Sequence, residues 1–448
     1  MDRIEISGIK KFRGEFFPPP DKSISHRAVI FSSISKGKGI VKNLLGAKDV
    51  ESTVNAFRSL GIEIEKKFTQ KSGSELRTLP TGRQAPNSEL IIHGKGLHGL
   101  SEPPDIIDCG NSGTTIRLLS GVLSGNPFFS VLTGDSSLRT RPMARVIKPL
   151  SLMGAEISAR DQDRFPPMAI KGKHLSPIKY QMPVASAQVK SSIILAGLYS
   201  DGETEITEPS KSRDHTERML PAFGADLKVE GLKVMVKGGT ELSPMETEVP
   251  GDFSSAAFFI VASLLIPGSE ITAKNVGINP TRTGLLDILR EMGAKIGIEN
   301  IREVSGEPVA DLHCRGTSGL KAVNVPGESI PSLIDEFPIL CIAASLAEGT
   351  TTIKGAEELR VKESDRIRSM ASELKKMGVE IEEFPDGLSI MGSGTLKGAE
   401  VESHGDHRVA MSMTIAALVA EGKSTINGAS AVDISFPGFF DIIRKLSS

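Results

Sequence analysis

The stretch Leu285-Leu286-Asp287-Ile288-Leu289-Arg290-Glu291-Met292-Gly293-Ala294-Lys295-Ile296 decides how this chain folds. The apolar residues before Gly293 recur at helical spacing, which predicts an amphipathic helix. Gly293 stands where such a helix would end in a left-handed residue, a conformation that glycine adopts at little steric cost. The residues after Gly293 alternate between apolar and polar, as in a half-buried strand. The stretch therefore predicts a helix, a glycine stop and a strand.

The same phrase occurs five times, which predicts a fold built from copies of one α/β unit. Its glycines are Gly61, Gly154, Gly224, Gly293 and Gly378. They are too far apart and too unevenly spaced for a solenoid of short repeats. The closing segment 437–446 is similar to one more helix, cut off before its strand, and brings the expected number of units to six. A common helix-to-strand turn reused by chance is the alternative.

Two proline-containing stretches predict crossings between domains. They are the triple proline at 18–20 and Val249-Pro250-Gly251-Asp252. If both are hinges, residues 1–20 plus 251–448 form one discontinuous domain, and residues 21–250 form an inserted domain. Ligands often bind in a cleft between two domains, so the active site is expected there. The polar span from Lys66 to Glu89 is predicted to be an exposed hairpin or loop without chemistry.

Composition excludes several classes of protein. The chain has 448 residues, of which 39% are hydrophobic and 24% charged, as in soluble globular proteins. A net charge of −2 gives no general attraction to nucleic acids or anionic membranes, and the absence of Trp argues against base stacking. The longest apolar run, 256–266, is too short to span a bilayer and predicts a buried helix. The N-terminus lacks an apolar signal core, so a cytoplasmic location is expected. Neither the cysteines nor the histidines show metal-ligand spacing, and no metal is expected.

Polar turns with cations precede several predicted helices. After the prolines, Asp21 or Ser23 is placed to cap a helix that continues through His26 and Arg27. The N–H groups of a helix start attract anions, and Lys22 and Arg27 lie beside them. Polar caps alone are ordinary, but lysine and arginine are disfavoured at a helix N-terminus unless an anion lies there. Similar turns occupy 108–117, 134–143, 186–192, 211–216, 332–338, 359–367 and 404–410. If the units are parallel, these turns face one positively charged cleft.

Taken together, these turns resemble the signature motifs of the 5-enolpyruvylshikimate-3-phosphate synthase family. The motifs that carry the resemblance are Asp21-Lys22-Ser23-Ile24-Ser25-His26-Arg27, Gly110-Asn111-Ser112-Gly113-Thr114-Thr115, Arg141-Pro142-Met143, Arg360-Val361-Lys362-Glu363-Ser364-Asp365-Arg366 and Gly405-Asp406-His407-Arg408. The resemblance implies the enolpyruvyl transferase fold, an inside-out α/β barrel with two domains, each of three βαβαββ units. It also implies transfer of the enolpyruvyl group of phosphoenolpyruvate to the 5-hydroxyl of shikimate 3-phosphate, with release of phosphate. This is the sixth step of the shikimate pathway to chorismate and the aromatic amino acids, and no cofactor is expected.

The family pattern also implies the site residues. Lys22 would lie between both substrates. Shikimate 3-phosphate would be held by Lys22, Ser23, Arg27, Ser186, Ala187, Gln188, Arg213, Asp335 and Lys362. Phosphoenolpyruvate would be held by Lys22, Gly113, Arg141, Gln188, Arg366 and Arg408. The catalytic residues would be Asp335, Glu363 and Lys22.

The chemistry asks for these residue types. Both substrates are anions, which fixed cations in a closed site bind well. Asp335 is the candidate base for the 5-hydroxyl, and Glu363 or Lys22 is the candidate proton donor to C3 of phosphoenolpyruvate. A carboxyl that both donates and accepts needs a pKa near neutral, so a raised pKa is predicted for Glu363. Its alternative role is that of an ion-pair partner of Arg360 or Arg366.

Three neighbouring residues are assigned no direct part in the reaction. Because Asp335 and Glu336 are adjacent, only one of them is expected to face the pocket. His26 is expected to be structural. His407 is expected to support Arg408 or the region of Glu363.

One position departs from the family pattern. Some members carry a lysine two residues before the final Phe-Pro, where this chain has Ile434. One cation for phosphoenolpyruvate would then be absent or supplied elsewhere. Gly113 is the position whose size governs the room for glyphosate in this family, so the chain is expected to be a glyphosate target.

Two other functions are weighed against this one. The related UDP-N-acetylglucosamine enolpyruvyl transferase family shares the fold and carries a reactive cysteine in a mobile loop, for which Cys109 is the candidate here. The Asp-Lys-Ser and Lys-Glu-Ser-Asp-Arg phrases argue against it. A phosphate- or nucleic-acid-binding repeat protein is the non-enzyme alternative, which the near-neutral charge disfavours. No long exposed apolar face is evident, so a monomer is expected.

Overall fold

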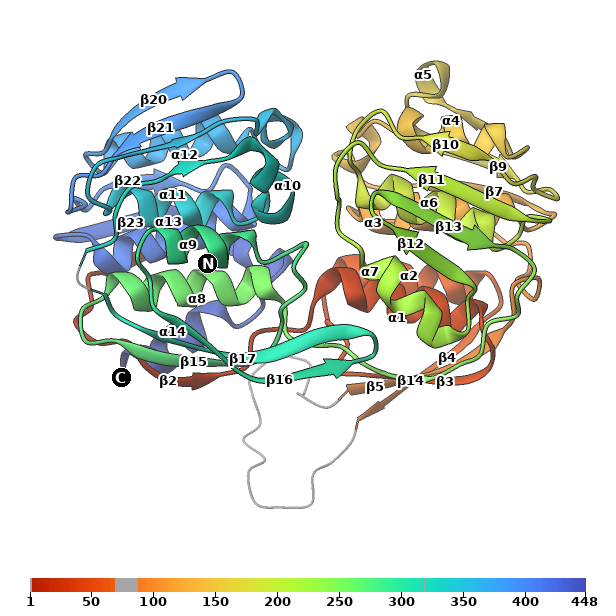
Figure 1. Ribbon diagram of the computed structural model, residues 1–448, viewed down its shortest axis with the longest axis horizontal. Helices are drawn as coiled ribbons and strands as arrows, with labels where there is room; N and C mark the ends of the chain where they lie inside the picture. Colours follow the sequence, from red (N-terminus) through yellow and green to blue (C-terminus); the bar gives the residue numbers. More distant parts are fainter. Residues whose placement is uncertain (1, 69–87, 318) are drawn as a thin grey trace. The chain divides into compact units, whose positions relative to one another are not determined.

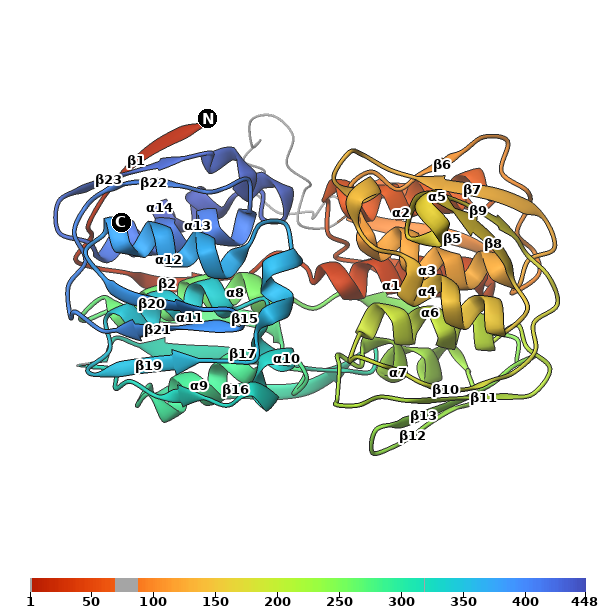
Figure 2. The same ribbon diagram turned by 90° about the horizontal axis from the view of Figure 1, so that it is seen from above.

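The computed structural model describes residues 2–68, 88–317 and 319–448, and the chain divides into two compact units (Figures 1 and 2). We call Met1–Pro19, Gly251–Arg302 and Pro308–Ser448 the terminal unit, and Pro20–Pro250 with Glu303–Glu307 the inserted unit. These limits differ from the predicted domains at Pro20 and at Glu303–Glu307. Most of the span predicted as an exposed hairpin or loop, residues 69–87, lies outside the described residues.

Among its described residues, the inserted unit contains three four-stranded sheets. In order of pairing, their strands are β14 (Glu246–Glu248), β3 (Lys36–Lys42), β5 (Ser88–Lys95) and β4 (Glu63–Phe68); β6 (Ile107–Asp108), β7 (Phe129–Thr133), β9 (Phe165–Lys171) and β8 (Glu156–Ala159); and β10 (Lys179–Gln181), β11 (Glu203–Thr207), β13 (Lys233–Lys237) and β12 (Leu227–Glu230). Its helices are α1 (Lys22–Ile34), α2 (Lys48–Ser59), α3 (Gly113–Ser124), α4 (Ala144–Leu152), α5 (Arg160–Asp163), α6 (Ala187–Gly197) and α7 (His215–Met219), with 3-10 turns η1 (Leu138–Thr140) and η2 (Leu220–Phe223).

The terminal unit also contains three sheets in its described part. Their strands, in order of pairing, are β16 (Ile296–Val304), β17 (Glu307–Arg315), β15 (Glu270–Gly277) and β2 (Arg13–Phe16); β18 (Asn324–Val325), β19 (Thr350–Ile353), β21 (Gly387–Met391) and β20 (Glu380–Phe384); and β1 (Arg3–Ser7), β23 (Lys423–Asn427) and β22 (Glu400–Glu402). Its helices are α8 (Phe253–Leu265), α9 (Gly284–Glu291), α10 (Ile330–Leu333), α11 (Phe337–Ser345), α12 (Arg366–Lys376), α13 (His407–Val419) and α14 (Phe439–Ser447), with 3-10 turns η3 (Gly327–Ser329), η4 (Glu357–Val361) and η5 (Ala429–Ile434).

One connectivity recurs in all six sheets. β6 pairs in parallel with β7 across α3, and the chain then passes through α4 into the antiparallel pair of β8 and β9. The strand pairs β10–β11, β14–β3, β2–β15, β18–β19 and β22–β23 are parallel in the same way. This is the βαβαββ unit. In the described part of the chain, five of the six sheets have its four strands and the sixth has three, so the prediction of six units is confirmed.

The repeated glycines end helices as predicted. Gly61, Gly154, Gly224, Gly293 and Gly378 have φ values of 87°, 106°, 90°, 96° and 89°. Each is followed within three residues by a strand, β4, β8, β12, β16 or β20. A side chain at these positions would be strained by the left-handed backbone, which explains why the phrase keeps its glycine.

Three sheets take a strand from a distant part of the chain. β14 pairs with β3. β2 pairs with β15, although residues 20–250 of the inserted unit separate the two strands in the sequence. β1 pairs antiparallel with β23, with Ile4 opposite Ile426. The last unit, which the sequence predicted to be cut off before its final strand, therefore receives β1 in that place.

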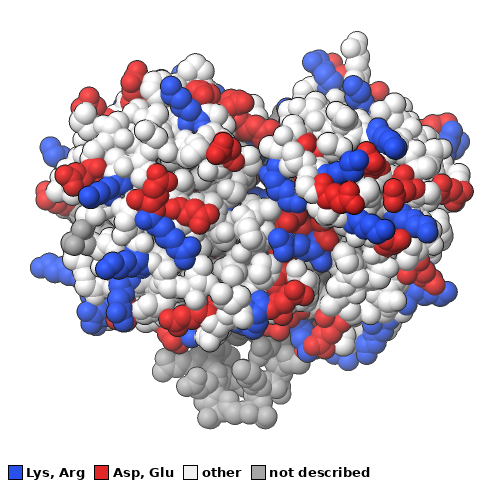
Figure 3. Space-filling model, in the orientation of Figure 1, with Lys and Arg blue, Asp and Glu red and all other residues white. Residues whose placement is uncertain are grey.

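The helices that carry the predicted turns run into the two cores. α8, α11 and α13 are buried along almost their whole length in the terminal unit, as are α1, α3 and α6 in the inserted unit. A helix that is apolar on all sides needs cover on all sides, so its polar N-terminus is the part placed to meet a ligand. On the face shown in Figure 3, Lys and Arg are interspersed with Asp and Glu, as the net charge of −2 leads one to expect.

Candidate active site

The first two turns of α1 carry three residues that were predicted to bind substrate: Lys22, Ser23 and Arg27. They belong to a group of polar side chains in the inserted unit, which we call the inserted unit's cluster. Asp21 caps the helix, because its Oδ1 accepts a hydrogen bond from Ile24 N at 2.8 Å. Lys22 Nζ lies 3.2 Å from Asp49 Oδ2. Burial acts to raise the pKa of Asp49, but the charge and hydrogen bond of Lys22 oppose it, and the pKa lies below its ordinary value. Lys22 is thus held by a charged partner that the sequence did not identify.

Arg27 is buried and joined to three segments. Its Nε donates to Thr216 Oγ1 at 2.7 Å, its Nη2 to Ser191 Oγ at 2.8 Å, and its Nη1 to Ser23 O at 3.0 Å. Burial lowers the pKa of Arg27 to about 10, so the guanidinium keeps its charge at neutral pH. These three hydrogen bonds fix the orientation of the Arg27 guanidinium.

His26 has the structural place that was predicted for it. The ring is fully buried, and its Nδ1 lies 2.7 Å from Thr53 Oγ1. Burial, the largest influence, lowers the pKa of His26 from 6.5 to about 3. The folded protein therefore holds His26 neutral wherever the unfolded chain would begin to protonate it.

Acid is expected to destabilise the protein through His26. Between about pH 6.5 and 3 the unfolded chain binds a proton that the folded protein excludes, so stability rises with pH in this window and is lost as the pH falls. In His26→Gln this contribution is absent. The stability difference between wild type and variant should shrink by on the order of 3 kcal/mol from pH 7 to pH 4. Urea unfolding at several pH values measures it, and a difference that stays constant would contradict the buried neutral ring.

A second group forms at the N-terminus of α3. Ser112 caps the helix by accepting a hydrogen bond from Thr115 N. Arg141 Nη2 donates to Asn111 Oδ1 at 2.5 Å. Arg117 Nη1 donates to Gln188 Oε1 at 2.6 Å, and Gln188 Nε2 donates to Thr114 Oγ1 at 3.0 Å. The predicted residues Gly113, Arg141 and Gln188 are therefore brought together around one helix start.

Arg117 was not among the predicted site residues. It lies one turn after Gly113 on α3, so the helical period alone places it on the same face. Burial lowers the pKa of Arg117 to about 10, helped by the nearby Arg141 and Arg145. Two arginines near each other favour a bound anion.

If the chain binds the substrates that the resemblance implies, Gly113→Ala should weaken phosphoenolpyruvate binding while leaving the fold intact. A Cβ at this position would lie 2.8 Å from Arg117 Nη1 and 3.2 Å from Arg141 Nη1, so both guanidinium groups must move. These are the ends of flexible side chains, and little stability is lost. We expect KM for phosphoenolpyruvate to rise about tenfold while KM for shikimate 3-phosphate changes little. Steady-state kinetics with each substrate varied measures this, and equal changes in both values would be the contrary result.

The predicted residues Ser186, Ala187 and Arg213 lie at two further helix starts. Ser186 caps α6, with its Oγ 3.4 Å from Val189 N, and Ala187 is the first residue of that helix. Arg213 precedes the short helix α7. Apart from Arg27, which lies in the second turn of α1, the residues of the inserted unit that were predicted to bind substrate thus lie at or near a helix N-terminus.

In the terminal unit, Arg366 is the centre of a cluster of carboxylates. Its Nη2 lies 2.7 Å from Glu363 Oε2, its Nε 2.8 Å from Asp406 Oδ2, and its Nη1 3.3 Å from Asp335 Oδ1. The Arg366 side chain is only 1% exposed. Burial acts to lower the pKa of Arg366, but the carboxylates outweigh it and raise that pKa. The anionic partners of Arg366 in this structure are therefore carboxylates of the protein itself.

Arg408 converges on the same aspartate. Its Nη2 lies 3.3 Å from Asp335 Oδ2, and its Nη1 donates to Asp335 O at 3.1 Å. Asp335 is 18% exposed, whereas the side chain of Glu336 is buried and accepts a hydrogen bond from Ser254 Oγ. The two adjacent acids therefore differ as predicted, and Asp335 is the one that solvent reaches.

Lys362 and His407 lie beside this cluster. Lys362 follows η4, with its Nζ 3.9 Å from Glu358 Oε2, and burial is the main cause that lowers its pKa. Asp406 caps α13 through Arg408 N, and His407 is the first residue of that helix. Asp406 was not predicted as a site residue, although it joins Arg366 to the helix of Arg408.

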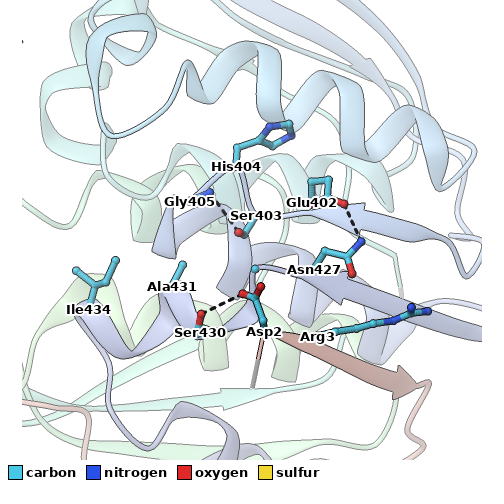
Figure 4. A pocket seen from close by; sticks show the side chains of 11 residues that line it. Asp2, Arg3, Glu402, Ser403, His404, Gly405, Asn427, Ser430, Ala431 and Ile434 are labelled. Carbon is cyan, nitrogen blue, oxygen red and sulfur yellow. Dashed lines mark hydrogen bonds between the residues drawn. The ribbon is translucent and has the colours of Figure 1, made fainter. Parts of the chain in front are cut away.

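A pocket of about 670 Å³ lies elsewhere in the terminal unit (Figure 4). Its polar lining groups bond to one another: Asn427 Nδ2 donates to Glu402 Oε1, Ser430 Oγ to Asp2 Oδ1, and Gly405 N to Ser403 Oγ. Ile434, the position that departs from the family pattern, also lines it. None of the residues predicted to bind substrate does, so we place the candidate site at the two charged clusters.

Two kinds of feature are absent from the described part of the chain. None of its helices combines the length and apolar character needed to cross a membrane. Within residues 2–68, 88–317 and 319–448, His, Cys, Asp and Glu side chains do not gather in threes or more in a way that could hold a metal ion.

Comparison with known proteins agrees with these features. The sequence profile of EPSP synthase (3-phosphoshikimate 1-carboxyvinyltransferase) matches residues 6–443. Proteins named 3-phosphoshikimate 1-carboxyvinyltransferase from Thermodesulfovibrio yellowstonii and Syntrophomonas wolfei are 54% and 52% identical to this chain, covering 100% and 99% of both partners in each pair. A solved EPSP synthase structure from Acinetobacter baumannii has a TM-score of 0.88 at 46% identity and covers 100% of this chain and 98% of its own.

The repeated βαβαββ units and these structural neighbours define an enolpyruvyl transferase fold. Within that class, the chain belongs to the EPSP synthase family. The resemblance seen in the sequence motifs is thereby confirmed.

Proposed function

We propose that this protein transfers the enolpyruvyl group of phosphoenolpyruvate to the 5-hydroxyl of shikimate 3-phosphate and releases phosphate. The full-length match to the EPSP synthase family is the observation that carries the proposal. The two clusters support it, because they supply cations for two anionic substrates and carboxylates for the proton transfers. The reaction is the sixth step of the shikimate pathway.

Each substrate takes residues from both clusters. Lys22, Ser23, Arg27, Ser186, Ala187, Gln188 and Arg213 of the inserted unit, with Asp335 and Lys362 of the terminal unit, hold shikimate 3-phosphate. Lys22, Gly113, Arg141 and Gln188, with Arg366 and Arg408, hold phosphoenolpyruvate. This requires the two clusters to face one cleft between the domains. A crystal grown with both substrates tests it, since Lys22, Arg141, Arg366 and Arg408 should surround one bound molecule.

The reaction then proceeds by addition and elimination. The oxygen of the 5-hydroxyl attacks C2 of phosphoenolpyruvate while Asp335 takes the hydroxyl proton. Glu363 or Lys22 delivers a proton to C3. The tetrahedral intermediate that results loses phosphate while C3 gives its proton back, which restores the double bond. The carboxylate of phosphoenolpyruvate replaces carboxylates of the protein around Arg366 and Arg408. That exchange releases Asp335 and Glu363 for proton transfer.

Glu363→Gln tests the role of Glu363. If this carboxyl moves the C3 proton, kcat falls about 10²- to 10⁴-fold and the limb of the pH–rate profile that reports its ionisation is lost. A profile with wild-type shape would show that Glu363 only pairs with Arg366, at the 2.7 Å distance observed.

A phosphate-release assay separates the candidate functions. Phosphoenolpyruvate is supplied with shikimate 3-phosphate in one reaction and with UDP-N-acetylglucosamine in another. Turnover only in the first is the expected result. Turnover only in the second would assign the chain to the related transferase activity, and turnover in neither would support a binding protein.

The finer expectations belong to the same proposal. The enzyme is a cytoplasmic monomer, and glyphosate occupies the phosphoenolpyruvate site beside Gly113. Light scattering measures the mass of the particle in solution. Inhibition by glyphosate that is competitive with phosphoenolpyruvate supports the shared site, and non-competitive inhibition opposes it.

A further inference from the structure

A buried ionic triad lies behind the proposed shikimate 3-phosphate residues of the inserted unit. Lys190 Nζ lies 2.7 Å from Glu208 Oε2 and 2.6 Å from Glu217 Oε1. The three side chains are 0%, 1% and 3% exposed. The mechanism uses none of them, and only Lys190 lies in one of the polar turns noted in the sequence, 186–192. We call Lys190, Glu208 and Glu217 the buried triad.

The buried triad joins three segments that carry proposed substrate residues. Lys190 belongs to α6, whose first turn carries Ser186 and Gln188. Glu208 follows β11 and accepts a hydrogen bond from Ser212 Oγ, the neighbour of Arg213. Glu217 belongs to α7, which begins two residues after Arg213. One lysine therefore links the start of α6 to both sides of Arg213.

The same network reaches Arg27. Thr216, next to Glu217, accepts from Arg27 Nε at 2.7 Å, and Ser191, next to Lys190, accepts from Arg27 Nη2 at 2.8 Å. Ser191 Oγ and Thr216 Oγ1 are 2.6 Å apart, so α6 and α7 meet directly at the guanidinium. Glu217 is the nearby carboxylate that acts most to keep Arg27 protonated. A displacement within the triad is thus transmitted to Arg27 as well.

Stability alone is a poor explanation for such a cluster. Removing ions from water costs so much that a buried ion pair is often no more stabilising than apolar side chains of similar size. The cost is visible here, because burial raises the pKa of Glu217 despite its contact with Lys190. What charged hydrogen bonds provide in return is direction, since each fixes a donor and an acceptor at a set distance and angle.

We propose that Lys190, Glu208 and Glu217 are positioning residues for shikimate 3-phosphate, which set Ser186, Gln188, Arg213 and Arg27 in the arrangement that receives its phosphate and hydroxyl groups. This inference rests on the proposed function. It predicts that loss of the triad weakens binding of shikimate 3-phosphate more than binding of phosphoenolpyruvate. A purely structural role would affect both substrates alike or only stability.

The decisive variant neutralises all three charges at nearly constant size: Lys190→Met, Glu208→Gln and Glu217→Gln together. Because no unpaired charge is left buried, the variant should fold, with a melting temperature close to that of wild type. Calorimetric titration without phosphoenolpyruvate should show a dissociation constant for shikimate 3-phosphate raised about 10- to 100-fold, the range found when groups that orient ligands are removed. KM for phosphoenolpyruvate should change much less. A folded variant with wild-type affinity, or with equal losses for both substrates, would overturn the inference.

A second variant and a control keep the test decisive. Glu208→Gln alone leaves Lys190 paired with Glu217, so it folds even if the triple variant does not. It should still weaken shikimate 3-phosphate binding several-fold, and unchanged binding would overturn the inference. The control is the ion pair of Lys233 and Glu205 in the same unit, which is 3.2 Å apart and partly exposed. Replacing Lys233 with Met and Glu205 with Gln should leave the binding of both substrates unchanged. Wild-type protein that binds no shikimate 3-phosphate would instead reject the proposed function itself.

Discussion

Replacing Arg366 with methionine is expected to destabilise the protein by about 3–5 kcal/mol, the usual cost of leaving a buried ionic partner uncompensated. Arg366 lies among Asp335, Glu363 and Asp406, and both it and Asp406 are almost fully buried. Methionine fills much of the space but leaves Asp406 without its charged partner. Turnover should also disappear, because the variant lacks a cation proposed for phosphoenolpyruvate. Urea unfolding and the phosphate-release assay measure the two effects.

The matched control for this variant is Arg444→Met. Arg444 is also paired with an aspartate, Asp441, but its side chain is 72% exposed. Water solvates the exposed guanidinium of Arg444, so the loss of this ion pair should change neither stability nor turnover appreciably. Arg366→Met with wild-type stability would show that the carboxylates around it do not depend on this arginine.

Asp335→Asn is expected to lower kcat by about 10²- to 10⁴-fold, the usual contribution of a general base. Asparagine keeps the size of the side chain and one oxygen for Arg366 or Arg408, so the protein should remain folded. It cannot accept the proton of the 5-hydroxyl. Binding of shikimate 3-phosphate should weaken far less than kcat falls, which distinguishes a lost base from a lost binding group.

A carboxylate of the same unit serves as the comparison for Asp335. Asp386 Oδ2 accepts a hydrogen bond from Gly355 N at the surface, away from the arginine pair. Asp386→Asn should therefore leave kcat unchanged. If Asp335→Asn kept kcat within a few-fold of wild type, another group would have to deprotonate the hydroxyl, and Asp335 would be a ligand of Arg366 and Arg408 only.

Most elements of the fold could be predicted from local patterns in the sequence. The five glycines marked helix ends because the left-handed backbone there is a property of one residue, readable without knowledge of the rest. A cap at Asp21 or Ser23 was likewise predicted from the local residue types, and Asp21 is the one that forms it. The sequence did not predict which distant segment supplies the edge strand of a sheet. β14 pairs with β3 from more than two hundred residues away along the chain, and no local pattern in either strand specifies the partner.

The site divides in the same way. Residues in the motifs were identified by type, yet their partners were not: Asp49 beside Lys22, Arg117 beside Gln188, and Asp406 beside Arg366. Each partner comes from another element or another turn of a helix, so its place depends on packing. Arg366 at the start of α12 is surrounded by anions, as expected for a cation at a helix N-terminus, but these anions are carboxylates of the chain itself.

The pairing of β1 with β23 also fixes an order of events during synthesis. Residues 3–7 leave the ribosome long before residues 423–427, with which they pair. The residues 20–250 of the inserted unit are almost continuous in sequence and can fold while β1 still lacks its partner strand. Pairing of β1 with β23 is therefore a late step that joins two segments far apart in the sequence, and a chain arrested before β23 is made leaves β1 unpaired.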